Sequence, residues 1–324
     1  MLVLTDGNAW GGIQSMTNTL RAQLDASGWH TTQVSVRDRG RLRLLWMAVR
    51  ADVLIASNNF YPAYLGLLLS FLSRTPLVVW VHGPLLEVLE HSHAHRWKRK
   101  FLKILYRHIQ YLVFVSHQSK KSFFEMVPNA QCHVVIPNAV PINKAIYANR
   151  PNLHALRLVY TGRLSAEKRP HLLIDTLRLL PTTAQLVIVG DGPMQQEIRV
   201  YGHDLLTDGR LVMTGARTFS ENLYEQFHFS LLTSHYEGCP MAALESLAVG
   251  IPCISVPTPA MKEIYGKTAP YLLASCGTAE ALARTIRAVA IMSSEKIGKD
   301  IAIIAARHQL PQFTRRWLEF LNKC

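Results

Sequence analysis

The sequence predicts an α/β fold of two doubly wound domains, each with a parallel sheet flanked by helices. Short apolar runs that suit buried strands alternate with helix-length segments along almost the whole chain. The runs lack a polar alternation, so both faces of each sheet are expected to be covered. A polar stretch at 143–154, which contains Pro151, separates two series of such runs. We therefore expect one domain over residues 1–150 and a second over residues 151–324.

Each series contains six expected strands. In the first series they are Leu2–Thr5, Gln33–Val36, Val53–Ala56, Leu77–Val81, Tyr111–Val115 and His133–Ile136. In the second they are Leu158–Tyr160, Gln185–Val189, Arg210–Met213, Ser230–Leu232, Cys253–Val256 and Tyr271–Leu273. The tail, Pro311–Cys324, has Phe313, Trp317 and Phe320 at helical spacing. It is expected to form an amphipathic helix that packs on one of the two domains, with the first domain as a candidate.

The positive charge of the chain is concentrated in its first half. The 324 residues include 35 Lys and Arg against 22 Asp and Glu. Residues 1–150 hold 17 basic and 7 acidic residues, a net charge of +10, whereas residues 151–324 have a net charge of only +3. Such an imbalance bears on partners rather than on fold. An anionic membrane surface, an anionic acceptor and nucleic acid are all candidate partners.

The cysteines and the apolar runs indicate a cellular compartment. Five cysteines without a C-x-x-C pair argue against a disulfide framework or a structural zinc site, and they favour a reducing compartment. The N-terminus lacks the basic start and the long apolar stretch of a signal peptide. The longest apolar run, Ala63–Leu72, is too short to span a bilayer. We therefore expect a cytoplasmic protein that is not integral to a membrane.

The stretch from Ser234 to Pro252 carries the most informative pattern. Glu237 and Glu245, with seven residues between them, flank an expected helix start near Pro240. Proline suits a helix start because its missing N–H would be unpaired there. The free amides and the helix dipole at such a start attract phosphate. Two carboxylates at different depths suit a sugar nucleotide, although a buried helix with two solvated glutamates is the alternative.

Two further turns of the first domain lie at strand ends, where ligands bind in open α/β sheets. Gly11 and Gly12 open the first helix, and glycines there let a backbone approach a phosphate closely. Their spacing is not G-x-G-x-x-G, which disfavours a nicotinamide-dependent dehydrogenase. His82 follows an expected strand and can donate a hydrogen bond to a sugar hydroxyl. The alternatives are an ordinary flexible turn and a histidine that is satisfied locally.

In the second domain, two cations follow the first expected strand. Arg163 and Lys168 suit a diphosphate, because Arg can bind two oxygens at once and Lys supplies a point charge. The alternative is a solvated charged loop. It is less attractive because the end of this strand is expected at the same sheet edge as Glu237.

Taken in order, these motifs resemble those of glycosyltransferase family 4 along nearly the whole chain. The resemblance implies the GT-B fold, in which two Rossmann-like domains face a cleft. The first domain would bind the acceptor and the second the nucleotide-sugar donor. Pro137-Asn-Ala-Val140 resembles the family's P-N-G-V linker, with Ala139 in place of glycine. Thr258–Glu263 departs from the family's G-G-x-x-E element, since only Glu263 is retained.

The resemblance also implies a role for each matching residue. Glu237 would face the transferred sugar and Glu245 the ribose, while the G-D-G-P turn would follow the second strand of the donor domain. The implied catalytic residues are Glu237, His82, Arg163 and Lys168. The implied donor-binding residues are Gly11, Gly12, Arg163, Lys168, Gly190, Gly192, Gly238, Cys239, Pro240, Met241, Ala242 and Glu245.

The implied activity is transfer of a hexose with retention at the anomeric carbon. The donor would be a nucleotide diphosphate sugar, with UDP-hexose favoured, and the acceptor a lipid-linked glycan, lipopolysaccharide or polysaccharide. The nucleotide sugar is a co-substrate, and we expect no cofactor and no metal, because the chain has no D-x-D triplet. The alternatives are a sugar-nucleotide epimerase or phosphorylase of the same architecture, or a basic nucleic-acid-binding protein. No recognition helix or aromatic-rich binding sheet supports the last of these.

The segment Arg96–Arg107 has the pattern of a basic amphipathic helix. Its cations recur at helical spacing, and Trp97, Phe101 and Ile104 lie opposite them. We expect this apolar side to pack on the sheet of its own domain and the cations to contact anionic lipid. The protein is therefore expected at the inner face of the membrane as a peripheral enzyme, without a nucleic-acid partner.

Overall fold

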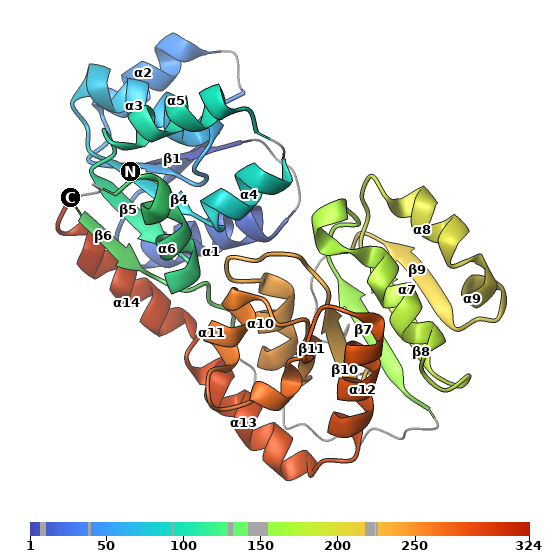
Figure 1. Cartoon of the computed structure of the whole chain (residues 1–324). Helices are drawn as coiled ribbons and strands as arrows, with labels where there is room; N and C mark the ends of the chain where they lie inside the picture. The colour runs from blue at the N-terminus through green and yellow to red at the C-terminus, as the bar shows by residue number, and fades with distance from the viewer. Residues whose placement is uncertain are drawn as a thin grey trace. The chain divides into compact units, whose positions relative to one another are not determined.

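Two compact α/β units make up the chain (Figure 1). The computed structural model describes residues 1–6, 11–37, 40–92, 94–128, 132–141, 155–217, 224 and 226–324. The first unit consists of Met1–Ala139 together with Leu310–Cys324, and the second of Val140–Gln309. The expected boundary at residues 150 and 151 lies outside the described residues.

The first unit contains a six-stranded parallel sheet in the order β2-β1-β3-β4-β5-β6. Its strands are β1 (Leu2–Thr5), β2 (Thr32–Ser35), β3 (Leu54–Ala56), β4 (Leu77–Val81), β5 (Tyr111–Phe114) and β6 (Cys132–Val135). The register pairs Leu4 with Ala56 and Val79 with Leu112. The strand order reverses between β1 and β3, so these two strands form the topological switch point, next to which ligands bind in this class of sheet.

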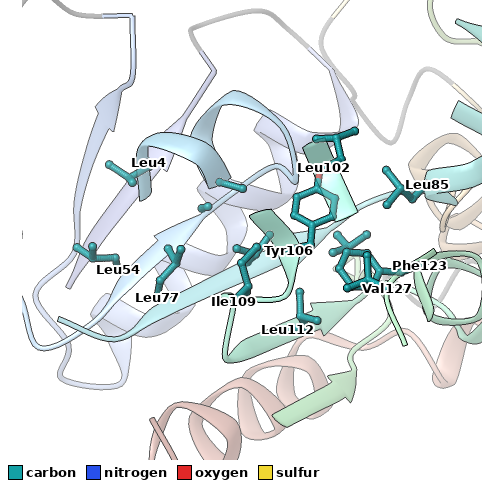
Figure 2. Close-up of a cluster of buried hydrophobic side chains, with 14 of the residues drawn as sticks. Leu4, Leu54, Leu77, Leu85, Leu102, Tyr106, Ile109, Leu112, Phe123 and Val127 are labelled. Carbon is teal, nitrogen blue, oxygen red and sulfur yellow. The ribbon is translucent and has the colours of Figure 1, made fainter. Parts of the chain in front are cut away.

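Helices cover both faces of this sheet. They are α1 (Gly12–Ala26), α2 (Arg41–Val49), α3 (Tyr61–Ser73), α4 (Leu85–His91), α5 (Arg96–Tyr106), α6 (His117–Met126) and α14 (Leu310–Leu321). The main core lies between the sheet and α2 to α6, where Leu4, Leu54 and Leu77 meet Tyr106 and Phe123 (Figure 2). Because side chains alternate along a strand, neighbouring strand residues point to the opposite face.

The opposite face is covered by α1 and by the C-terminal helix α14, which contact each other. Trp80, on β4, packs against Phe313 and Trp317 of α14, and the three side chains are buried. The apolar stripe of the tail thus belongs to the first unit, although about 170 residues of the second unit precede it in sequence.

The second unit contains a five-stranded parallel sheet in the order β11-β10-β7-β8-β9. Its strands are β7 (Arg157–Thr161), β8 (Gln185–Val189), β9 (Leu211–Gly215), β10 (Phe229–Leu232) and β11 (Cys253–Ser255). Here the strand order reverses between β7 and β10. Loops that leave these two neighbouring strands therefore meet at one edge of the sheet.

Helices again lie between the strands in sequence. They are α7 (Pro170–Arg178), α8 (Gln195–Tyr201), α9 (His203–Thr207), α10 (Met241–Ala248), α11 (Pro259–Tyr265), α12 (Ala279–Ala290) and α13 (Ser294–Ala306), with 3-10 turns at Ala166–Lys168 and Pro270–Leu272. The buried residues Val159, Val189, Tyr224, Phe227 and Ile251 form a core cluster of this unit.

The prediction of two doubly wound parallel sheets is confirmed, and one expected strand is wrong. The segment expected as a strand at Tyr271–Leu273 forms the 3-10 turn Pro270–Leu272. Pro270 at the first position of the turn favours this, because its φ is fixed and it has no N–H for a sheet. Leu273 retains an isolated parallel bridge to Ser255. The other expected strands agree with the structure to within two residues at each end.

No helix within the described ranges is both long enough and apolar enough to cross a bilayer.

Candidate functional site

Lys168 and Glu237 meet at the switch point of the second sheet. Lys168 follows β7 and Glu237 follows β10, and Nζ of the lysine lies 2.6 Å from Oε1 of the glutamate. The hydroxyl of Ser234 donates to the same carboxylate oxygen at 2.6 Å. Only 9% of the Glu237 side chain and 26% of the Lys168 side chain are exposed. The carboxylate is therefore held by a cation and a hydroxyl in a largely desolvated position, where such contacts are stronger than in water.

Backbone contacts hold the two loops together. The hydroxyl of Thr233 donates to the carbonyl of Lys168 at 2.6 Å, and the backbone N–H of His235 donates to the carbonyl of Glu167 at 2.8 Å. The position of the ion pair is thus fixed by main-chain hydrogen bonds on both sides.

Arg163 lies on the same loop as Lys168, in an exposed position. Its carbonyl accepts a hydrogen bond from the hydroxyl of Tyr160 at 3.0 Å, which anchors the backbone of the loop. Gly162, the preceding residue, has a backbone φ of 154°, a value that residues other than glycine rarely adopt. The guanidinium has no ion pair among the described residues. The backbone of Arg163 is therefore anchored, and its guanidinium is available to bind an anion.

Gly190 and Gly192 interlock the loop after β8 with the loop after β7. A Cβ on Gly190 would lie 1.8 Å from the carbonyl oxygen of Gly162, and one on Gly192 would lie 2.3 Å from that of Leu164. The N–H of Leu164 donates to the carbonyl of Asp191 at 2.9 Å. A side chain at either position would therefore collide with the backbone of the loop after β7. Their role at a nucleotide sugar remains a prediction.

The helix α10 starts directly behind Glu237. Pro240 is the residue before its first turn, and Met241 is the first helical residue. The first helical hydrogen bond runs from the N–H of Leu244 to the carbonyl of Pro240. The three N–H groups from Met241 to Ala243 consequently have no acceptor within the helix. They lie within a few residues of the Lys168–Glu237 pair, as the sequence predicts for an anion site.

Glu245 lies on α10 and is partly buried. Burial raises the pKa of its carboxyl to about 7. The neighbouring Tyr224 is buried, and its hydroxyl lies 2.8 Å from that of Thr161 at the end of β7. Burial, and after it the charge of Glu245, raises the pKa of the Tyr224 phenol. Tyr224 is therefore a group that responds to the charge of Glu245 and that the sequence did not single out.

The remaining predicted residues lie in the first unit. Gly11 precedes α1 and has open space where a Cβ would be. Gly12 is the first residue of that helix. His82 follows β4, and its ring lies 4.3 Å from that of Trp80 between centroids.

The surroundings of His82 keep its ring neutral. Burial lowers the pKa of the imidazole to about 3. Its Nε2 atom is buried without a hydrogen-bond partner among the described residues. Buried polar atoms are nearly always hydrogen-bonded, so an unpaired ring nitrogen is a notable feature of this strand end.

The segment that departs from the expected glycine-rich pattern forms a capped helix start. The hydroxyl of Thr258 accepts a hydrogen bond from the N–H of Met261 at 3.3 Å, and Pro259 is the first residue of α11. Glu263 lies within this helix rather than on a loop. Within the described ranges, no group of three or more His, Cys, Asp or Glu side chains is arranged to hold a metal ion.

Two family models match consecutive parts of this chain. The model described as Glycosyltransferase Family 4 matches residues 30–144, and that described as Glycosyl transferases group 1 matches residues 145–302. The chain belongs to glycosyltransferase family 4.

Curated family 4 relatives match parts of the chain. A lipopolysaccharide 1,6-galactosyltransferase of Escherichia coli K12 is 34% identical over 127 residues, which cover 37% of this chain and 35% of the relative. A UDP-Gal:alpha-D-GlcNAc-diphosphoundecaprenol alpha-1,3-galactosyltransferase of Escherichia coli is 29% identical over 228 residues, which cover 62% of this chain and 57% of the relative. The matched part of the chain thus spans between about a third and a little over half of these relatives.

Solved structures confirm the family 4 fold. The crystal structure of Anabaena HepE in complex with UDP and glucose has a TM-score of 0.82 at 18% identity, and covers 100% of this chain and 99% of that one. The lipopolysaccharide outer core galactosyltransferase WaaB has a TM-score of 0.69 at 19% identity. The fold of two parallel-sheet α/β domains is therefore GT-B, as the sequence predicted.

Several residues around the family 4 motifs escaped the sequence analysis. Ser234, Thr233 and Tyr160 hold the Lys168–Glu237 pair and its loops, and Tyr224 lies beside Glu245. A hydroxyl three residues before Glu237 and another at a strand end are common patterns, so no sequence signal distinguished them. The partners of Thr233 and Tyr224 are 65 and 63 positions away, and these contacts become visible only in the folded chain.

Proposed function

We propose that this family 4 glycosyltransferase moves a hexose from UDP to a lipid-linked glycan or lipopolysaccharide acceptor, with retention at the anomeric carbon. The observation that carries the proposal is the Lys168–Glu237 pair at 2.6 Å, with the amides that begin α10 following Glu237 by four to six residues. An anion-binding cation and a hydroxyl-binding carboxylate side by side suit the junction of a diphosphate and a sugar. The names of the relatives and the UDP in the HepE crystal support the choice of donor.

In the proposed reaction, the acceptor oxygen bonds to the anomeric carbon while the bond from that carbon to the diphosphate breaks. The acceptor proton leaves with the diphosphate, which gains negative charge as it departs. Lys168, Arg163 and the α10 amides would stabilise that charge, and preorganised groups of this kind contribute most where charge develops. We propose that they suffice without a metal ion.

Glu237 would bind sugar hydroxyls rather than attack the anomeric carbon. Its Oε1 atom already accepts hydrogen bonds from Lys168 and Ser234, so the lone pairs of this oxygen are engaged. The other carboxylate on these loops, Glu167, accepts a hydrogen bond from the Ser165 hydroxyl. We propose that the two carboxylates do not act as a glycosidase pair of acid and nucleophile.

Five further residues would complete the donor site. Glu245 as a carboxylate can accept hydrogen bonds from ribose hydroxyls, and the adjacent Tyr224 is an additional group for the nucleoside. His82 would use its unpaired Nε2 toward a sugar hydroxyl, since its neutral ring can either donate or accept. Gly11 and Gly12 would let the backbone of the first unit approach the diphosphate.

The acceptor side of the proposal rests on charge. The first half of the chain has a net charge of +10, and the helix α5 is dense in Lys and Arg. We propose a peripheral enzyme at the inner face of the membrane, held in part by α5, with no nucleic-acid partner. A lipid-linked acceptor, as in the names of the Escherichia coli relatives, would be found at such a surface.

A donor screen tests the proposal. Thermal shift with UDP, GDP and ADP should show stabilisation by UDP, since a ligand bound only to the folded state raises its stability. Release of UDP from UDP-glucose or UDP-galactose should require added lipopolysaccharide or lipid-linked acceptor, and proton NMR of the product should show the anomeric configuration of the donor. Stabilisation by GDP alone would refute the choice of nucleotide, and an inverted product would refute retention.

Two outcomes of the same screen would favour the alternatives. Conversion of UDP-glucose to UDP-galactose without any acceptor would indicate an epimerase. Release of sugar phosphate on addition of inorganic phosphate to a glycan would indicate a phosphorylase.

A further inference from the structure

The apolar side of α5 does not pack on its own sheet, contrary to the expectation from the sequence. Trp97, Phe101 and Ile104 are 69%, 51% and 59% exposed. The helix is held instead by Leu102 and Tyr106, which are buried in the core of the first unit (Figure 2). The stripe that the sequence assigned to packing is therefore an outer surface. Large exposed apolar patches mark sites of interaction with a protein or a membrane.

The two helices next to α5 expose apolar side chains as well. On α2, Leu42, Trp46 and Val49 are exposed at a spacing of four and three residues, which puts them on one side of the helix. On α3, Leu68, Phe71 and Leu72 form a similar exposed group, and Phe71 is 82% exposed.

These three helices cover the same face of the first sheet. Inward residues of α2, α3 and α5 belong to one core cluster. Helices α2 and α3 contact each other, and the rings of Tyr64 on α3 and Tyr106 on α5 lie 6.5 Å apart. Figure 1 shows the three helices together at one end of the first unit. Their outward sides thus lie on the same side of that unit, and we call their exposed residues the three-helix surface.

The charge of this surface is entirely positive. Residues 41–50 and 96–107 contain no Asp or Glu, and α3 has no charged residue at all. The cations with described side chains are Arg43, Arg50, Arg96, Lys98, Arg99, Lys100, Lys103 and Arg107. The guanidinium of Arg50 lies 3.7 Å from the ring centre of Trp46, so a cation and an exposed aromatic ring form one unit.

We propose that the three-helix surface inserts into the anionic leaflet of a membrane. Its apolar side chains would enter the boundary between head groups and acyl chains, and its cations would bind lipid phosphates. The combination of cations and exposed apolar side chains favours this occupant. Two copies of the chain would bring like charges together, and the aliphatic Leu42, Leu68, Leu72 and Ile104 have no use on a nucleic acid. Amphipathic, basic surfaces with Trp, Phe and Leu bind in the interface of anionic bilayers.

The inference deepens the proposed function and rests on it for the lipid-linked acceptor. It adds that attachment is by insertion of residues from three helices and not by the charge of α5 alone. Electrostatic adsorption is reversed by salt, whereas burial of apolar side chains is not.

The test is flotation of the full chain with vesicles of phosphatidylcholine with and without phosphatidylglycerol. We expect binding that needs phosphatidylglycerol, and that in 0.5 M NaCl retains a measurable fraction. Brominated acyl chains should quench the fluorescence of Trp46 and Trp97, and W46F and W97F should each remove part of the quenching. The triple variant L68S/F71S/L72S should bind at least tenfold more weakly. A matched triple variant on the second unit, V200S/I291S/I303S, should bind within twofold of wild type.

Three results would overturn the inference. They are absence of vesicle binding, full release by salt without bromine quenching, and unchanged binding of L68S/F71S/L72S. A dimer in analytical ultracentrifugation that this variant abolishes would instead identify a second copy as the occupant. Thermal shift with UDP on each variant tests the proposed function separately from membrane insertion, because vesicle binding does not require donor binding. A chain that binds vesicles but no nucleotide diphosphate would refute the proposed function alone.

Discussion

The ammonium of Lys168 lies 2.6 Å from a carboxylate oxygen of Glu237, although 69 positions separate the two residues in sequence. The pair joins the loop after β7 to the loop after β10, at the point where the strand order of the second sheet reverses. The sequence assigned the lysine to a diphosphate and the glutamate to a sugar. The structure makes them one electrostatic unit, so a change in either residue alters the surroundings of the other.

Loss of Lys168 should abolish turnover while the fold is kept. We expect Lys168→Ala to lower kcat by at least about 10²-fold, since it removes a cation from the departing diphosphate. The substitution also removes the cation that pairs with Glu237, so the double variant with Glu237→Gln should show a non-additive loss. Initial rates of UDP release and the thermal midpoint check both points. Lys299→Ala, which removes an exposed pair with Glu295, is the matched control. A wild-type rate in Lys168→Ala would show that Lys168 does not stabilise the departing diphosphate.

The carboxyl of Glu245 should make stability depend on pH. Its folded pKa of about 7 lies above the ordinary value of 4.5, so the folded state favours the protonated form. The associated stability is complete below pH 4.5 and is lost as the pH rises through 7. Glu245→Gln should therefore match wild type at pH 4 and exceed it at pH 8, by up to about 3 kcal/mol. Urea unfolding at both pH values measures the difference, and parallel curves for the two proteins would contradict the prediction.

The affinity for UDP should also depend on the ionisation of Glu245, but here the ionised form is the favourable one. If the ionised Glu245 accepts hydrogen bonds from ribose, the affinity for UDP should increase between pH 6 and pH 8 in wild type. In Glu245→Gln this part of the pH dependence should disappear, and only that of UDP itself should remain. Calorimetric titration with UDP at several pH values provides the measurement. An equal increase in both proteins would show that Glu245 does not contact the nucleotide.

Gly190 and Gly11, both of which the family resemblance assigned to donor binding, should respond differently to substitution. Gly190→Ala should destabilise the second unit by about 2 kcal/mol or more, because its Cβ would lie 1.8 Å from the carbonyl of Gly162. Gly11→Ala should leave the thermal midpoint unchanged, since nothing lies within 4 Å of its Cβ and its φ of 168° is extended. If a diphosphate approaches this backbone, Gly11→Ala should nevertheless lose activity. Full activity of that variant would remove Gly11 from the donor site.

His82 should act as a neutral group over the whole working range. Its pKa is lowered to about 3 by burial against Trp80. His82→Gln should therefore reduce the rate by the same factor at every pH between 5.5 and 8.5. Any limb of the pH–rate profile near 7 should instead disappear in Glu245→Gln. A profile in which His82→Gln removes a limb near pH 6.5 would show that the histidine titrates during the reaction.

The sequence by itself determined the fold class and most of the candidate residues. Buried strands of parallel sheets are continuous apolar runs, and turns at their carboxyl ends keep glycine, proline and charged residues, so these signals are local. The tail shows the limit of such signals. Its apolar stripe predicted a helix, yet only the pairing of Trp317 with Trp80 assigns that helix to the first unit.

Tertiary structure decided what local patterns leave open. The contacts of Lys168 with Glu237 and of Thr161 with Tyr224 join residues that are far apart in sequence, and they arise from a strand order that no single segment encodes. The same holds for α5, where the pattern predicted an amphipathic helix with Trp97 facing the core. Periodicity identifies a polar and an apolar side, but only packing against neighbouring helices determines which apolar residues are buried.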